Sequence, residues 1–160
     1  RVQQTAGAPG QLFVEVRNHR PADDARSVFT FGASMTHYID GFVLPIPHSG
    51  LDEYRRLVET VSDIWREHGA LDYREYVCDD MNLEGTRSFT DLVAAAEDEA
   101  IVFGWVVFES RAARDRVNEK VSTDPRMAEL MSSSSSGFDA ERMAYGGFQP
   151  FVQSSNAHSE

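Results

Sequence analysis

The sequence predicts an α+β protein of the ferredoxin-like βαββαβ class, with a four-stranded antiparallel sheet that pairs with a second copy as a dimeric α+β barrel. Two observations lead to this prediction. Strand and helix patterns follow one another in the order strand, helix, strand, strand, helix, strand between residues 38 and 152. The third strand, within AIVFGWVVFES, is apolar on both faces, and one layer of helices covers only one of them.

The first strand and the first helix have the clearest boundaries. YIDGFVLPI, residues 38–46, is rich in strand-forming residues and ends among prolines. Ser49 and Asp52 have the spacing of a capping box and predict that a helix begins there. Apolar and aromatic residues then recur every three or four positions, which predicts an amphipathic helix that Gly69 ends. The stripe consists of Leu51, Tyr54, Val58, Val61, Trp65 and His68.

The second half of the pattern repeats this alternation. A second strand is predicted over residues 71–78, and a short helix within 88–99 follows it. Ser110 and Asp124 have the character of N-cap residues, and Asp124 is followed by a proline, so they predict two further helices. The last strand is predicted over 142–152. In the third strand one face carries Ile101, Phe103, Trp105 and Val107, and the other carries Val102, Gly104, Val106 and Phe108.

These elements form one domain, predicted over residues 35–152. Residues 1–34 lack this regular pattern and are predicted to be a flexible or non-native extension, with an additional edge strand at 11–17 as the alternative. Residues 153–160 have no apolar periodicity and predict a disordered tail. The run of five serines at 132–136 predicts a flexible surface loop.

Composition excludes several classes of function. The net charge of -11 over 160 residues opposes binding to nucleic acid and to anionic membrane surfaces. Cys78 is the single cysteine, which leaves no internal disulfide, and no apolar run approaches the roughly 20 residues of a spanning helix. We therefore expect a cytoplasmic protein. We expect no cofactor and no metal, because the sequence has no glycine-rich phosphate loop, Cys/His metal spacing or nucleophile elbow.

His68, in the segment IWREHGALDY, is the candidate catalytic residue. In the last turn of a helix that Gly69 ends, an imidazole interacts favourably with free carbonyl groups and with the helix dipole, which is a structural role. The functional hypothesis is a general base in a pocket between helices and sheet, because histidine titrates near neutral pH.

Three aromatic residues are candidates for the lining of such a pocket together with His68. Trp65, Tyr73 and Trp105 have the size and polarity for this, although aromatic residues at these spacings are more often part of a core. Basic residues gather on the helix after Ser110, where acidic residues interleave with them and predict an exposed helix with salt bridges. They are Arg111, Arg114, Arg116 and Lys120.

Three function classes are compatible with the sequence. The first is a homodimer that binds a small molecule in a pocket between helices and sheet. The second is a cofactor-independent enzyme of the oxygenase or isomerase kind that uses His68, and the third is a dimer that binds another protein. An internal cavity with convergent polar groups favours the first two.

Several blocks of the sequence resemble the YbaA-like family of small bacterial proteins, a domain of unknown function. The blocks are YIDGFVLPIP, WREHGALDY, DDMNLEGTRSF, EDEAIVFGWVVFESRAARDRVNEKV and FDAERMAYGGF, and the resemblance as a whole spans about residues 35–148. The resemblance implies a ferredoxin-like, dimeric α+β-barrel fold and no established activity. Members of that family begin where Met35 stands, so we predict Met35 as the natural start and residues 1–34 as an addition.

Overall fold

A computed structural model describes residues 37–152 of the 160-residue chain. The predictions for residues 1–34, including the edge strand at 11–17, and for the tail at 153–160 fall outside the described residues.

The fold is the predicted ferredoxin-like α+β arrangement. The main elements are β1 (Tyr38–Pro47), α1 (Leu51–Glu67), β2 (Asp72–Val77), β3 (Glu99–Phe108), α3 (Arg111–Thr123) and β4 (Ala144–Phe148). Shorter helices connect them: η2 (His48–Gly50), α2 (Phe89–Leu92), α4 (Pro125–Ser133) and η3 (Ala140–Arg142). The strands form one antiparallel sheet in the order β2-β3-β1-β4, which makes β2 and β4 the edge strands.

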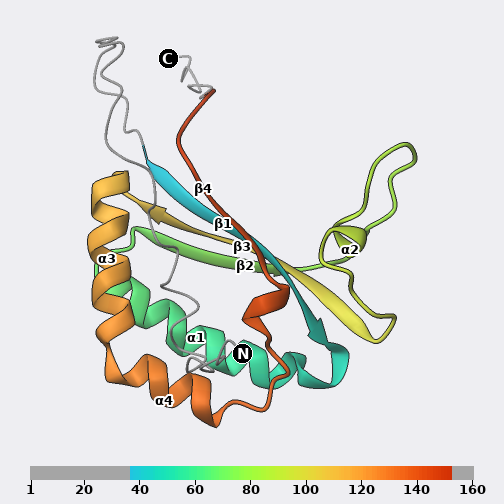
Figure 1. Cartoon of the computed structure of the whole chain (residues 1–160), viewed down its shortest axis with the longest axis horizontal. Helices are drawn as coiled ribbons and strands as arrows, with labels where there is room; N and C mark the ends of the chain where they lie inside the picture. Colours follow the sequence, from blue (N-terminus) through green and yellow to red (C-terminus); the bar gives the residue numbers. More distant parts are fainter. Residues whose placement is uncertain (1–36, 153–160) are drawn as a thin grey trace, which may run out of the picture.

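The sheet has two unlike faces. Helices α1, α3 and α4 lie on one side of it, and the segment with α2 projects from the other side (Figure 1). The main core lies between the sheet and the helices, because alternate residues of β1 and β3 point toward α1 and α3. Its most deeply buried members are Leu44, Ile46, Ile64, Phe108 and Val121.

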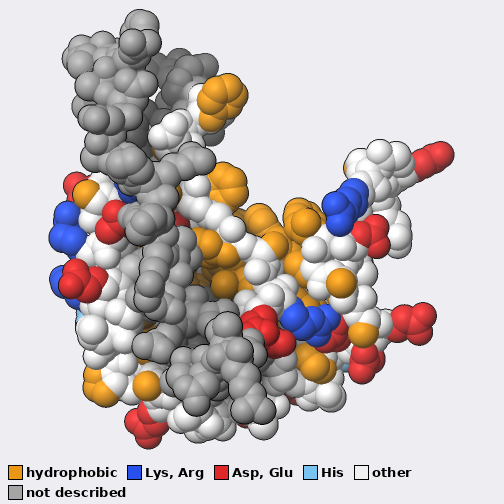
Figure 2. Space-filling model, viewed as in Figure 1, with side chains coloured by type: hydrophobic (Ala, Val, Ile, Leu, Met, Phe, Trp, Pro, Cys, Tyr) orange, Lys and Arg blue, Asp and Glu red, His pale blue; other side chains and the backbone are white. Residues whose placement is uncertain are grey.

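The other face of the sheet keeps aromatic side chains in contact with solvent. Tyr76 stacks on Trp105 at a ring-centroid distance of 5.3 Å, and Phe103 contacts both Trp105 and Phe89. Phe103 is 40% exposed and Tyr76 is 50% exposed. Hydrophobic side chains gather on this face, beside the projecting α2 segment (Figure 2). The prediction that β3 is apolar on both faces is confirmed.

Two of the predicted helix caps are confirmed and one is wrong. The side chains of Ser110 and Asp124 each accept a backbone N–H of the first turn of α3 and α4. Ser49 caps nothing, because it lies in η2, and α1 begins after Gly50 without a side-chain cap. Tertiary packing, and not a side-chain cap, characterises the start of α1. The backbone of Ser136 lies so close to Gly50 that a Cβ atom on Gly50 would be 2.1 Å from the carbonyl oxygen of Ser136.

That contact also corrects the prediction of a loose serine loop at residues 132–136. The first two serines belong to α4, and Ser136 is 2% exposed. Ser135 donates both its backbone N–H and its hydroxyl to Glu53 of α1. Long-range contacts, which local composition does not reveal, hold the serine segment in place.

The last strand is also shorter than predicted, since β4 pairs with β1 over five residues only.

Candidate functional site

A cavity of about 490 Å³ lies between α1 and the edge strand β2, and we call it the α1–β2 cavity. Buried Tyr54 and Val102 line its inner part, whereas Asp52, Arg55 and Glu59 of its lining are exposed. The complete lining is Leu51, Asp52, Tyr54, Arg55, Val58, Glu59, Ser62, Tyr73, Glu75, Tyr76, Val77 and Val102. The cavity is large enough for a small organic molecule.

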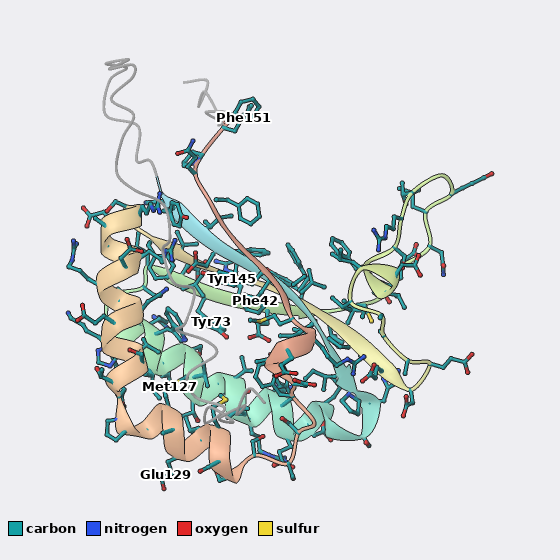
Figure 3. All side chains as sticks on the ribbon, in the orientation of Figure 1. Phe42, Tyr73, Met127, Glu129, Tyr145 and Phe151 are labelled. Atoms are coloured by element: carbon teal, nitrogen blue, oxygen red, sulfur yellow. The ribbon has the colours of Figure 1, made fainter. Side chains whose placement is uncertain are left out.

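The polar centre of the cavity is one carboxylate held by two phenols. Tyr54 donates its hydroxyl to Glu75 Oε2 at 2.8 Å, and Tyr73 donates its hydroxyl to Glu75 Oε1 at 2.6 Å. Tyr73 and Glu75 are two residues apart on β2, so both side chains point to the same face of the sheet. Tyr54 comes from the inward stripe of α1, and Tyr73 lies between the sheet and the helices (Figure 3).

The environment of this group shifts the pKa values of all three side chains. Burial raises the pKa of Glu75 above its ordinary value, although the hydrogen bonds from Tyr73 and Tyr54 act in the opposite direction. Burial, and then the negative charge of Glu75, raise the pKa values of both phenols well above the ordinary range. The phenols are therefore hydrogen-bond donors near neutral pH, and Glu75 is the proton acceptor of the group.

Glu75 has no cationic partner within residues 37–152. Its hydrogen bonds come from tyrosine hydroxyl groups, which carry no charge. Arg55, which lines the same cavity, pairs with Glu59 at 3.3 Å, and Arg74 on β2 pairs with Asp72 at 2.7 Å. Among the described residues, the carboxylate thus has neutral donors only, and it is half-buried.

A glycine on the neighbouring strand makes room for Glu75. Gly104 lies directly opposite Glu75 in the β2–β3 pairing. A Cβ atom at Gly104 would lie 2.8 Å from Glu75 Cγ and 2.6 Å from the ring of Phe42. Real Cβ atoms do not approach other atoms this closely, so the absence of a side chain at this position lets the stem of Glu75 lie across β3.

A second buried carboxylate lies on the same face of the sheet, and it has a cation. Asp40 of β1 is 2% exposed, and its Oδ1 is 3.6 Å from Nε of Arg114 on α3. Burial raises the pKa of Asp40, while a hydrogen bond with Tyr145 and the charge of Arg114 lower it. Arg114 also donates to the hydroxyl of Tyr38 at 3.1 Å. The prediction that Arg114 lies on an exposed helix face is wrong, because it is 6% exposed.

Comparison with known proteins places the chain in a family. Residues 37–140 match the model of a family described as "Protein of unknown function (DUF1428)". The chain belongs to the DUF1428 family. It is 36% identical to the uncharacterized protein YbaA of Escherichia coli K12 over an alignment of 115 residues. The alignment covers 72% of this chain and 97% of YbaA. YbaA of Shigella flexneri matches to the same extent. The resemblance of the sequence to the YbaA-like family is thereby confirmed.

Solved structures with a similar chain trace include a monooxygenase from the gene ActVA-Orf6 of Streptomyces coelicolor in complex with nanaomycin D. It is 19% identical, with a TM-score of 0.46, covering 77% of this DUF1428 chain and 95% of the monooxygenase. Another is a dimeric ferredoxin-like protein from an uncultured marine organism, 8% identical with a TM-score of 0.40, covering 74% of this chain and 99% of that one.

The four site residues predicted from the sequence of this DUF1428 member lie in different places. Tyr73 lines the α1–β2 cavity. Trp65 is 4% exposed in the core, with its ring 6.0 Å from that of Phe108, and together with Tyr73 it borders a much smaller void. Trp105 stacks on Tyr76 on the face of the sheet away from the helices. These aromatic residues do not line one common pocket.

His68 is the residue that follows the last turn of α1. Its Nε2 atom lies 2.8 Å from Asp124 Oδ2, and Asp124 is the N-cap of α4. Gly69, with φ of +117°, then turns the chain out of the helix as predicted. The side chain of His68 therefore joins the end of α1 to the start of α4, outside the lining of the cavity. A catalytic role for His68 stays an untested prediction.

Sequence reasoning missed Glu75 and Tyr54 as members of a site. A signal for Glu75 exists, because it falls between Tyr73 and Val77 on the inward-facing positions of β2, where a charged residue is unusual. The spacing of Tyr54 indicates only that it belongs to the apolar stripe of α1. Within residues 37–152, no group of three or more metal-ligating side chains is placed to hold a metal ion, and no helix is long and apolar enough to cross a membrane.

Proposed function

We propose that this DUF1428 protein binds a small organic molecule in the α1–β2 cavity. The observation that carries the proposal is the combination of a 490 Å³ cavity with one half-buried carboxylate and two phenols converging in it. Ligand sites in proteins are typically concave, mostly apolar and equipped with a few placed polar groups. Val58 and Val102 supply apolar wall, and the Tyr54, Tyr73 and Glu75 group supplies the polar centre.

The test is a fragment screen with a variant that fills the cavity. Ligand-observed NMR on the full chain identifies fragments that bind, and their affinities are then measured for Val58→Trp and for Thr60→Trp. Val58 lines the cavity, whereas Thr60 is an exposed residue of the same helix outside the lining. We expect Val58→Trp to weaken binding at least about tenfold, because an indole occupies the ligand's space, and Thr60→Trp to bind as the wild type does.

Two results contradict the proposal. One is a screen in which no fragment binds to the wild-type chain. The other is equal affinity of every binding fragment for wild type and Val58→Trp, which places their binding elsewhere. Thermal unfolding of both variants establishes that they are folded under the conditions of the measurement.

We further propose that the protein forms a homodimer through the face of the sheet that lies away from the helices. The support is the row of partly exposed aromatic side chains on that face, which includes Phe103, Tyr76 and Trp105. Burial of apolar surface contributes roughly 25 cal/mol per Å², so several hundred Å² per subunit favour association before its entropic cost. Sedimentation equilibrium at micromolar concentration tests this, and a single species at 17.9 kDa would exclude the dimer.

A further inference from the structure

We infer that the ligand of the α1–β2 cavity is an organic cation, an amine whose ammonium group pairs with Glu75 while its apolar body fills the cavity. The inference rests on the proposed function and names the class of its ligand. It follows from three properties of the cavity: an uncompensated carboxylate, an excess of negative charge in the lining, and an apolar wall.

The first property is the missing charge partner of Glu75. A carboxylate taken partly out of water is normally paired with a cation, because the loss of hydration disfavours the charged form. Within residues 37–152, Glu75 has hydrogen bonds from Tyr54 and Tyr73 and no ion pair. Each carboxylate oxygen accepts one phenol, and a carboxylate has about four acceptor positions, so capacity for a donor from the cavity remains. A bound ammonium group supplies both the donor and the charge.

The second property is the sign of the charge in the lining. Three carboxyl groups line the cavity, on Asp52, Glu59 and Glu75, against the single guanidinium group of Arg55. Arg55 already pairs with Glu59 at 3.3 Å. The net charge of the whole chain, -11, has the same sign. The cavity therefore attracts cations and repels anionic ligands.

The third property is the apolar wall, which favours an organic body over a bare ion. Val58, Val77 and Val102 line the cavity together with the rings of Tyr54 and Tyr73. A volume of about 490 Å³ exceeds what an inorganic ion fills. The ring of Tyr73 lies beside the carboxylate that it bonds, and aromatic faces near an ammonium group add cation–π attraction.

The experiment compares three probes of one shape and different charge on the full chain near neutral pH. The probes are phenethylamine as the cation, 2-phenylethanol as the neutral analogue and phenylacetate as the anion, with affinities from ligand-observed NMR or calorimetry. We expect phenethylamine to bind at least about tenfold more tightly than 2-phenylethanol, since hydrogen bonds to charged groups are the stronger ones, and phenylacetate to bind weakest.

Two matched variants show whether Glu75 is the group that selects the cation. Glu75→Gln keeps the shape and removes the charge, so the amine and the alcohol should then bind about equally. Asp63→Asn removes an exposed carboxylate of α1 that lies outside the lining, and the preference for the amine should persist. A preference that survives in Glu75→Gln, or an alcohol or acid that binds wild type as tightly as the amine, overturns the inference.

These outcomes are separable from those of the proposed function. If 2-phenylethanol or any screened fragment binds wild type and is lost in Val58→Trp without a preference for the amine, the cavity is a ligand site and the cation assignment is wrong. If phenethylamine does not bind at all, the cation assignment is again wrong, and the fragment screen decides the proposed function by itself.

Discussion

Asp40 and Glu75 are two carboxylates on the same face of one sheet, and they differ in what surrounds them. Burial raises the pKa of both. Asp40, on the internal strand β1, has Arg114 of α3 at 3.6 Å and a hydrogen bond with Tyr145, which Figure 3 shows on the helix-facing side of the sheet. Glu75, on the edge strand β2, has two phenols and opens to a cavity.

The difference teaches how to separate structural charges from functional ones in this protein. A buried charge beside a cation from the same chain is compensated electrostatically, and removal of that cation disturbs the fold. A partly buried charge with neutral donors only is left available for a ligand that brings the opposite charge. The four predictions below test that distinction.

The largest effect is expected for Arg114→Met, which leaves Asp40 as a buried charge without a cation. The free energy of unfolding should fall by about 3 to 5 kcal/mol, the usual result of breaking one side of a buried ion pair. Urea denaturation near neutral pH measures it. Combining the change with Asp40→Asn should restore much of the loss, because the uncompensated charge is then gone. A loss well below 1 kcal/mol in the single variant would show that Asp40 does not depend on Arg114.

An intermediate effect is expected for Gly104→Ala. The added methyl group would lie 2.6 Å from Phe42, 2.7 Å from the backbone carbonyl oxygen of Arg74 and 2.8 Å from Glu75 Cγ, so both side chains and the backbone of β2 must shift. Overpacking of this kind typically costs about 1 to 3 kcal/mol, and displacement of Glu75 should also weaken ligand binding. Chemical denaturation and the probe titration measure the two effects. Gly85→Ala is the comparison for steric crowding, because nothing lies within 4 Å of a Cβ atom at that position. Any loss of stability in Gly85→Ala comes from backbone strain, since the φ angle of Gly85 is positive.

A smaller effect is expected for His68→Asn. Asp124, the carboxylate that His68 contacts, also pairs with Arg126 at 2.8 Å, so it keeps a cation when the imidazole is removed. Loss of one hydrogen bond should cost on the order of 1 kcal/mol or less, and ligand affinity should be unchanged because His68 lies outside the cavity lining. A collapse of ligand affinity in this variant, with stability retained, would instead support the hypothesis of a catalytic or ligand-binding histidine.

The last prediction concerns pH and separates Glu75 from the other carboxylates. The pKa of Glu75 in the folded protein is raised above its ordinary value of 4.5. The contribution of Glu75 to stability is therefore fully present below pH 4.5 and is lost as the pH rises through the folded-state pKa. Wild type should therefore lose stability relative to Glu75→Gln between mildly acidic and neutral pH. Saturating phenethylamine should oppose this loss, since the cation stabilises the ionised carboxylate. An identical pH dependence for both proteins would contradict the raised pKa.

Local patterns in the sequence determine the order of elements in this protein. The alternation in β3, the stripe of α1 and the caps at Ser110 and Asp124 depend on residues a few positions apart, so each could be predicted from a short window. Gly69 ends α1 for the same local reason. Where a boundary depends on distant contact, as at Gly50 against Ser136, local reasoning failed.

Only the tertiary structure decides the candidate site. Tyr54 and Glu75 are 21 residues apart and meet because α1 packs across β2, and Glu75 fits because the strand pairing sets Gly104 opposite it. The sequence by itself gives the types of these residues and the face of the strand on which Glu75 lies. Whether an acidic side chain finds a cation, as Asp40 does in Arg114, or only neutral phenols depends on the assembly of distant elements, because electrostatic compensation is a property of three-dimensional distance.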